Sequence, residues 1–297
     1  MRQHRGAGFA AIGAIYVVAA AVGVIVFLAL PQPSLPWRVL AGDLAATLFV
    51  WLAGVALRNA SVYDPYWSVA PIVILTGLAA RTGKLDAGTV LLLVAIWYWG
   101  VRLTANWAVT FINLSTQDWR YDDLKAKFPR LFQLVSLTGI TLFPTIVVYL
   151  CLLPAVEFVR RGGLNAWTVA GFAVCVGAAT LQLVADAQMQ AFRRAHALAD
   201  DGGTRHEIIR TGLWRHARHP NYLGEIAMWW GVYLMMLSVA PGQWVLGAGA
   251  LVNTGMFLFV SIPMADRRNA ALRPGFDAYR RETNSLLPLR LPGKPAR

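Results

Sequence analysis

The sequence predicts an all-α fold, a polytopic transmembrane helix bundle of seven to eight spans. Of the 297 residues, 57% are hydrophobic and only 14% are charged, whereas a soluble domain carries about 25% charged residues. Twelve Trp and 26 Gly are typical of membrane helices and their interfaces. The apolar residues form long uninterrupted runs, which exclude a transmembrane barrel, because barrel strands alternate apolar and polar residues over about ten positions.

Eight apolar segments follow one another along the chain. They lie at 9–30, 39–57, 67–80, 89–112, 131–153, 166–189, 222–240 and 243–262. A segment of about 20 residues crosses the hydrocarbon core of a bilayer. The third and the seventh are short or contain polar residues, so seven spans is the alternative to eight.

The first segment is expected to stay in the protein as a helix. It runs from Phe9 to Leu30, which is longer than the apolar core of a signal peptide and has no small-residue cleavage site. No repeat of fixed period and no low-complexity linker divides the chain. We therefore predict one integral membrane domain over residues 1–297.

The distribution of Lys and Arg predicts the orientation. With eight helices, 21 of the 27 basic residues fall in the N-terminus, the second, fourth and sixth loops and the C-terminal tail, and five fall in the opposite loops. The positive-inside rule then places both termini in the cytosol. This asymmetry accounts for the net charge of +12 without a nucleic-acid partner. We expect a multi-pass protein of the cell inner membrane, with membrane lipids as partners.

Most polar residues gather on that cytosolic side. They form the segments 112–130 and 182–225 and the tail from residue 266 onward. A water-soluble cofactor would bind in this layer, and a lipophilic small molecule would enter from the bilayer. The predicted bundle therefore has a cytosolic cofactor-binding layer. The histidines lack partner cysteines or carboxylates at zinc spacing, so we expect no metal.

The densest chemical information lies in the segment TGLWRHARHPNYLGE, residues 211–225. Arg215 and Arg218 precede Pro220, and a helix is predicted to begin near Asn221. Basic side chains beside a helix N-terminus bind anions, because the free N–H groups and the helix dipole add to their charge. Lipid headgroups are the alternative ligands of such a basic cluster. They do not require an acid such as Glu225 within the following turns.

This motif carries a resemblance to a known family. RHPNYLGE followed by MWWG resembles the C-terminal part of steroid 5α-reductase-type membrane reductases, especially the bacterial DUF1295-like proteins. Sterol C14- and C7-type reductases carry a related motif, and isoprenylcysteine and phospholipid methyltransferases carry a looser version, RHPxYxGE. The resemblance covers residues 160–290 and extends to residues 40–130.

The resemblance implies NADPH as the cofactor. Asp186 and Arg193 lie seven residues apart, two turns along one helix face, and similar reductases contact the dinucleotide with an acid and an arginine at this spacing. The cofactor-binding residues that the resemblance and the motif suggest are Gln182, Asp186, Arg193, Arg215, Arg218, Asn221, Tyr222, Glu225, Arg267, Arg268 and Tyr279. Two alternatives stay open: Asp186 pairs with Arg193 or Arg194, and Glu225 pairs with Arg218.

The resemblance also implies a catalytic pair in the N-terminal half. Animal 5α-reductases have an acid seven residues before a proline and a tyrosine one helix later. Here Asp64 precedes Pro71, and Tyr98 follows in IWYWGVR; an Asp stands where the family has a Glu. Tyr63 and Tyr66 are alternatives for the tyrosine. An aromatic belt at the membrane interface is the alternative explanation of Tyr98 and its two Trp neighbours.

Together these residues predict an oxidoreductase that acts on CH–CH groups. We expect it to use NADPH to reduce the C=C bond of a lipophilic enone, such as a 3-oxo-4-ene steroid or an isoprenoid-derived ring. A membrane methyltransferase that uses S-adenosylmethionine is the first rival, and a lipid-binding scaffold without catalysis is the second. The Asp186–Arg193 spacing and Asn221 favour the reductase.

Overall fold

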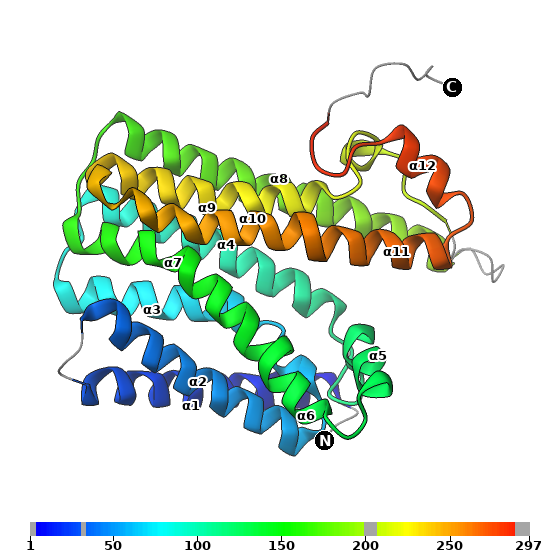
Figure 1. The fold of residues 1–297 in the computed structure, drawn as a ribbon, viewed down its shortest axis with the longest axis horizontal. Coiled ribbons are helices and arrows are strands. Elements are labelled where there is room, and N and C mark those ends of the chain that lie inside the picture. Colours follow the sequence, from blue (N-terminus) through cyan, green and yellow to red (C-terminus); the bar gives the residue numbers. More distant parts are fainter. Residues whose placement is uncertain (1–3, 31–33, 199–206, 289–297) are drawn as a thin grey trace.

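The computed structural model describes residues 4–30, 34–198 and 207–288, and these ranges contain helices and no strand (Figure 1). The helices are α1 (Arg5–Ala29), α2 (Leu35–Leu57), η1 (Ala60–Tyr63), α3 (Tyr66–Thr82), α4 (Ala87–Thr110), α5 (Trp119–Lys127), α6 (Phe132–Val135), η2 (Ser136–Leu142), α7 (Phe143–Arg161), α8 (Ala166–Leu198), η4 (Gly212–Arg215), α9 (Pro220–Val239), η5 (Pro241–Gly247), α10 (Ala248–Met256), η6 (Phe257–Ser261), α11 (Ile262–Leu272) and α12 (Phe276–Glu282).

The all-α polytopic bundle is confirmed. In the described residues seven helices are long and apolar enough to cross a membrane, and two of them are composite: Phe132–Arg161 and Pro241–Leu272. The third predicted segment, 67–80, corresponds to α3, a 17-residue helix with Pro71 inside it, and would be the eighth span. It lies between α2 and α4 in the left-hand part of Figure 1.

The beginning of α1 and the ends of α11 and α12 lie at the same end of the bundle. Arg5, the first residue of α1, donates a hydrogen bond to the carbonyl of Ala108 near the end of α4 (2.7 Å). Arg268 of α11 stacks on the ring of Trp119 in α5, with 3.4 Å from the guanidinium carbon to the ring centroid. Figure 1 shows α1 beginning, and α11 and α12 ending, at the end that carries α5.

Two predicted segments extend further than the apolar runs. The fifth continues to Arg161 and the eighth to Leu272, and each contains π-helical turns, at Ser136–Leu142 and at Phe257–Ser261. A proline follows each π-helical stretch, Pro144 and Pro263. Proline has no N–H and clashes with the preceding turn, and wider turns relieve that clash inside a long helix.

Helices α8 and α9 pack closely enough for their backbones to meet. A Cβ on Gly231 would lie 2.6 Å from the sulfur of Cys175, and a Cβ on Gly224 would overlap the side chain of Gln182. Small residues permit such close approach of membrane helices. Gly224 therefore fixes the start of α9 directly against Gln182 in α8.

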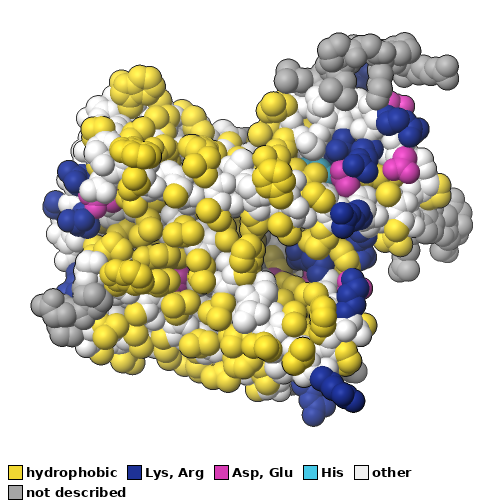
Figure 2. All heavy atoms as spheres, viewed as in Figure 1, with side chains coloured by type: hydrophobic (Ala, Val, Ile, Leu, Met, Phe, Trp, Pro, Cys, Tyr) yellow, Lys and Arg dark blue, Asp and Glu magenta, His cyan; other side chains and the backbone are white. Residues whose placement is uncertain are grey.

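Charge separates into two end layers with an apolar band between them. Figure 2 shows the larger group of Lys and Arg side chains over α5, α11 and α12, and a smaller group at the opposite end. The polar layer predicted from the sequence thus lies at one end of the bundle, where α8 ends and α9 begins.

Candidate functional site

A buried carboxylate links α4, α8 and α9. Glu225, in the second turn of α9, is 8% exposed. Its oxygens accept hydrogen bonds from the indole N–H groups of Trp99 (2.8 Å) and Trp229 (2.9 Å) and from the Gln182 amide (3.1 Å). Three donors satisfy the buried charge. The alternative pairing of Glu225 with Arg218 is wrong, because Arg218 lies in the charged layer with a different acid.

An arginine inside the bundle completes this network. Arg102 of α4 forms an ion pair with Asp186 of α8 (Nη1 to Oδ2, 2.7 Å), with side chains 4% and 14% exposed. It also donates a hydrogen bond to the Gln182 carbonyl oxygen. Asn221 of α9 donates to the other Asp186 oxygen at 3.4 Å. The alternative pairing of Asp186 with Arg193 or Arg194 is therefore wrong. Arg102 is the ion-pair partner of Asp186, because α4 packs its buried guanidinium directly against α8.

Beside Asp186 lies a cavity of about 290 Å³, here called the polar cavity. It lies at the end of the bundle where α8, the start of α9, α11 and α12 meet. Six of the predicted residues line it: Asp186, Arg193, Arg218, Asn221, Tyr222 and Tyr279. Gln182 and Glu225 lie one layer deeper and hold this lining in place.

Positive charge at the polar cavity lacks a partner. Arg193 and Arg273 line it, and neither forms an ion pair within the described ranges. Burial lowers the pKa of Arg273, and the nearby charges of Arg193 and Arg268 lower it further. An anion among these guanidinium groups would relieve that repulsion through charge-assisted hydrogen bonds.

The RHP motif holds the C-terminal tail against the cavity. Arg218 pairs with Asp266 of α11 (3.1 Å) and donates to the carbonyl of Thr283. His219 shares the same acid, with 2.9 Å from Nε2 to Oδ1. These motif residues therefore connect the start of α9 to α11 and to the C-terminal tail.

Aromatic rings form one wall of the polar cavity. Tyr222 stacks on His219 with 5.0 Å between ring centroids and 7° between planes. Tyr279 of α12 donates a hydrogen bond to the carbonyl of Trp214, and burial raises its pKa to about 12. Aromatic side chains from α9 and α12 thus line this side of the cavity.

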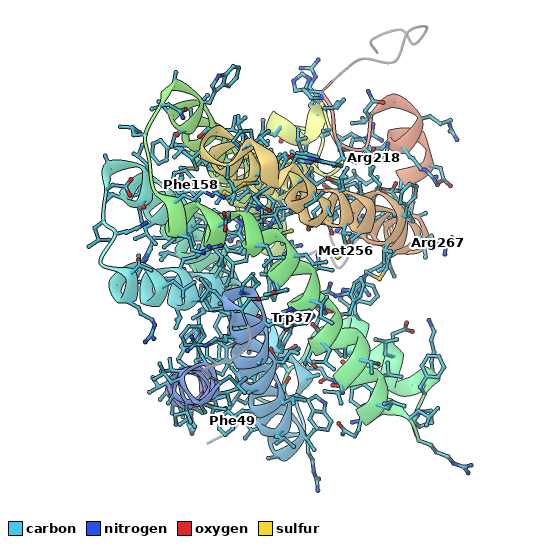
Figure 3. All side chains as sticks on the ribbon, turned by 60° about the vertical axis from the view of Figure 1, so that its left-hand side comes forward. Trp37, Phe49, Phe158, Arg218, Met256 and Arg267 are labelled. Carbon is cyan, nitrogen blue, oxygen red and sulfur yellow. The ribbon has the colours of Figure 1, made fainter. Side chains whose placement is uncertain are left out.

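Three predicted phosphate ligands lie outside the polar cavity. Arg215 and Arg267 are exposed, and Figure 3 shows Arg267 at the outer end of α11, away from Arg218. Arg268 is engaged with Trp119. Arg273, which the sequence analysis did not select, lines the polar cavity where these three arginines were expected.

A second, mostly apolar opening lies between α4 and α8, here called the α4–α8 crevice. Its volume is about 310 Å³, and Tyr98 and Arg102 line it. Asn106, Asp186 and Gln190 line both the crevice and the polar cavity, and Gln190 donates a hydrogen bond to Asn106. Asp186 therefore stands where an apolar space meets a polar, cationic one.

The predicted pair Asp64 and Tyr98 is not brought together. The Asp64 carboxylate accepts a hydrogen bond from Tyr121 of α5 (2.6 Å), and burial raises its pKa to about 6. The Tyr98 hydroxyl instead lies 3.1 Å from the Thr180 hydroxyl of α8. The alternatives Tyr63 and Tyr66 are bonded to Thr145 and Asp43 in the N-terminal half.

Sequence reasoning missed several residues around the two openings: Arg102, Asn106, Gln190, Asp266 and Arg273. For Arg102 the signal was available, because a charge within the apolar segment 89–112 is costly in a membrane and is functional by default. The described ranges hold no group of three or more His, Cys, Asp or Glu that could bind a metal.

Comparison with known proteins places the chain in a family. The family model described as "Protein of unknown function (DUF1295)" matches residues 50–283, from the second half of α2 to the end of α12. The curated proteins and the solved structures yielded no match. The matched region includes both openings and every residue of the Arg102–Asp186–Glu225 network, and the chain belongs to the DUF1295 family.

Proposed function

We propose that this protein is an NADPH-dependent membrane reductase that acts on the C=C bond of a lipophilic enone. One observation carries the proposal: a polar, cation-lined cavity and an apolar crevice meet at Asp186, Asn106 and Gln190. A reaction between a water-soluble cofactor and a bilayer substrate needs such a junction. A lipid-binding scaffold has no need of the polar half.

The residues present fit a dinucleotide. Arg193 and Arg273, which form no ion pair in the described residues, would hold phosphates, since the guanidinium group suits bidentate phosphate contacts. Asn221 would bind the nicotinamide amide or the ribose beside Asp186, and Tyr222 and Tyr279 would flank the rings. When bound, NADPH supplies a hydride, and the protein supplies orientation and electrostatics.

The protein's own contribution to reduction would come from the crevice wall. Reduction of an enone adds a hydride at the β-carbon and a proton at the α-carbon, and negative charge develops on the carbonyl oxygen. The Tyr98 hydroxyl, held by Thr180, would donate a hydrogen bond to that oxygen where water is scarce. Asp64 has no part in this arrangement, because it bonds to Tyr121 instead.

The cofactor assignment is tested by equilibrium binding of NADPH and of S-adenosylmethionine to detergent-purified protein. We expect NADPH to bind and Asn221→Ala to weaken its affinity at least tenfold, about 1.4 kcal/mol. Asn165→Ala is the matched control, because Asn165 caps α8 at the opposite end and its loss should leave the affinity unchanged. Binding of S-adenosylmethionine without NADPH would replace the reductase by a methyltransferase.

The orientation in the membrane is also a proposal. The 21 basic residues on one side predict that the end with α5, α11 and α12 faces the cytosol of the cell inner membrane. Reporter fusions after Arg297 should therefore be active only as cytosolic reporters. A fusion between α7 and α8 should behave in the opposite way, and a periplasmic reporter after Arg297 would reverse the assignment.

A further inference from the structure

The N-terminal half contains a separate crevice that shares no residue with the proposed reductase site. It lies between α1, α2 and α3, has a volume of about 340 Å³ and is lined almost entirely by apolar side chains. These three helices form the lower part of Figure 1. The polar groups that line it are Asp43, Tyr16 and Tyr66 toward one end and Arg81 at the other.

Asp43 is an acid inside a membrane-spanning helix. It lies eight residues after the first residue of α2, about 12 Å along the helix, and is 7% exposed. One carboxylate oxygen accepts the Tyr66 hydroxyl at 2.9 Å. The other oxygen has no hydrogen-bond partner in the described part of the chain. A charged group at this depth is expected to have a function.

Tyr66 cannot donate a second hydrogen bond to Asp43. Its hydroxyl already serves Asp43, and its ring packs between Tyr16 and Tyr63, with ring centroids 5.7 and 5.6 Å away. The Tyr16 hydroxyl donates to the carbonyl of Val62. The free Asp43 oxygen is therefore left to a donor that comes from outside the protein.

The other end of the crevice carries a positively charged side chain. Arg81, in the last turn of α3, lies with its guanidinium 5.8 Å from the Phe27 ring centroid and forms no ion pair in the residues that the structure describes. Arg38 lies over the same ring but is committed, because it donates two hydrogen bonds to the Phe27 carbonyl. Arg81 is thus available to an anion.

We propose that this crevice binds a long-chain hydroxy acid. Its carboxylate pairs with Arg81, its chain lies along α3, and a hydroxyl group donates to the free oxygen of Asp43. The lining residues of α3 run from Tyr66 to Arg81, about 22 Å of helix. A space of this length and small volume suits one extended chain better than a ring system.

The chemistry of both ends selects this ligand over other lipids. A phospholipid would pair its phosphate with Arg81, but its acyl chain would leave Asp43 without a donor. An amine would pair with Asp43 but would leave Arg81 without an anion. A hydroxyl group satisfies the acid and stays neutral.

Ricinoleate and oleate test the proposal, because they differ by one hydroxyl group. We expect wild-type protein in detergent to bind ricinoleate at least tenfold more tightly than oleate, measured by calorimetry. Asp43→Leu should remove that preference, and Arg81→Gln should weaken both acids equally. Thr141→Val is the matched control: Thr141 is a buried residue whose hydroxyl donates to the carbonyl of Leu137, lies outside the crevice lining, and should keep the preference.

The wild-type comparison requires no variant, so a folding failure of Asp43→Leu does not decide the outcome. Equal affinity of the two acids for wild-type protein would overturn the proposal. A ricinoleate preference that persists in Asp43→Leu would also overturn it. Purified protein that carries only phospholipid in this crevice and binds neither acid would identify an ordinary lipid site instead.

Discussion

Replacement of Asp186 by Leu is expected to destabilise the protein by about 3–5 kcal/mol, because it leaves the Arg102 guanidinium buried without its counter-ion. Arg102 is 4% exposed in its side chain and lies against α8, so its charge is largely shielded from water. Its Nε already lacks a hydrogen-bond partner in the described chain. Equilibrium unfolding in mixed detergent micelles measures the loss.

A double-mutant cycle separates the charge pair from the rest of the site. Arg102→Met combined with Asp186→Leu removes both charges, so the double variant should recover part of the stability that Asp186→Leu loses. About 1–3 kcal/mol should remain lost, because the Gln182 oxygen no longer has its Arg102 donor. NADPH affinity should not recover, since Asp186 and its contact with Asn221 are gone.

An exposed ion pair provides the matched control. Lys127 and Asp123 in α5 pair at 2.8 Å, with side chains 62% and 50% exposed. Exposed pairs contribute less than about 1 kcal/mol, so Asp123→Leu should change stability little. A cost for Asp186→Leu no larger than for Asp123→Leu would contradict the buried network described above.

The helices follow from the sequence because the bilayer imposes one simple requirement. A run of about 20 apolar residues forms a helix in which every backbone polar group is satisfied internally. The runs at 39–57 and 166–189 accordingly begin and end near the limits of α2 and the apolar part of α8. The end of the eighth run was predicted ten residues early, since α11 continues as a polar helix through Asp266.

Residues of the candidate site can be predicted from the sequence only where they belong to a short motif or share one helix face. Asp186 and Asn221 were selected from separate motifs, and the Gly224 contact with Gln182 brings them to one place. Spacing does not reveal that Arg102, 84 residues before Asp186, is its partner. The same limit explains Asp64 and Tyr98, whose separation along the chain fits the family although α5 supplies the partner of Asp64.

Glu225 shows how a motif residue can have an indirect role. Its position in RHPNYLGE suggested contact with the cofactor, yet two indoles and an amide surround its carboxylate. It fixes Gln182, which in turn orients Arg102 and so Asp186. A residue that aligns others in this way is a positioning residue.

Substitution of Tyr98 tests the proposed reduction step directly. Within the described residues its hydroxyl has one hydrogen-bond partner, Thr180 at 3.1 Å, and its half-buried ring lines the α4–α8 crevice beside Arg102. Tyr98 is not among the residues that line the polar cavity. Substitution of Tyr98 therefore affects the crevice without changing the residues proposed to hold NADPH.

Tyr98→Phe is expected to slow enone reduction by about 10²–10³, the usual cost of losing one oxyanion donor, while NADPH affinity stays within error of wild type. Phe keeps the ring and its packing, so stability should hardly change. The measurement is single-turnover loss of NADPH absorbance with an enone steroid. Tyr233→Phe is the control, because Tyr233 donates to the Trp244 carbonyl away from both openings. Full activity of Tyr98→Phe would make Arg102 the next candidate for the donor, and no NADPH consumption by wild type with any enone would overturn the reductase itself.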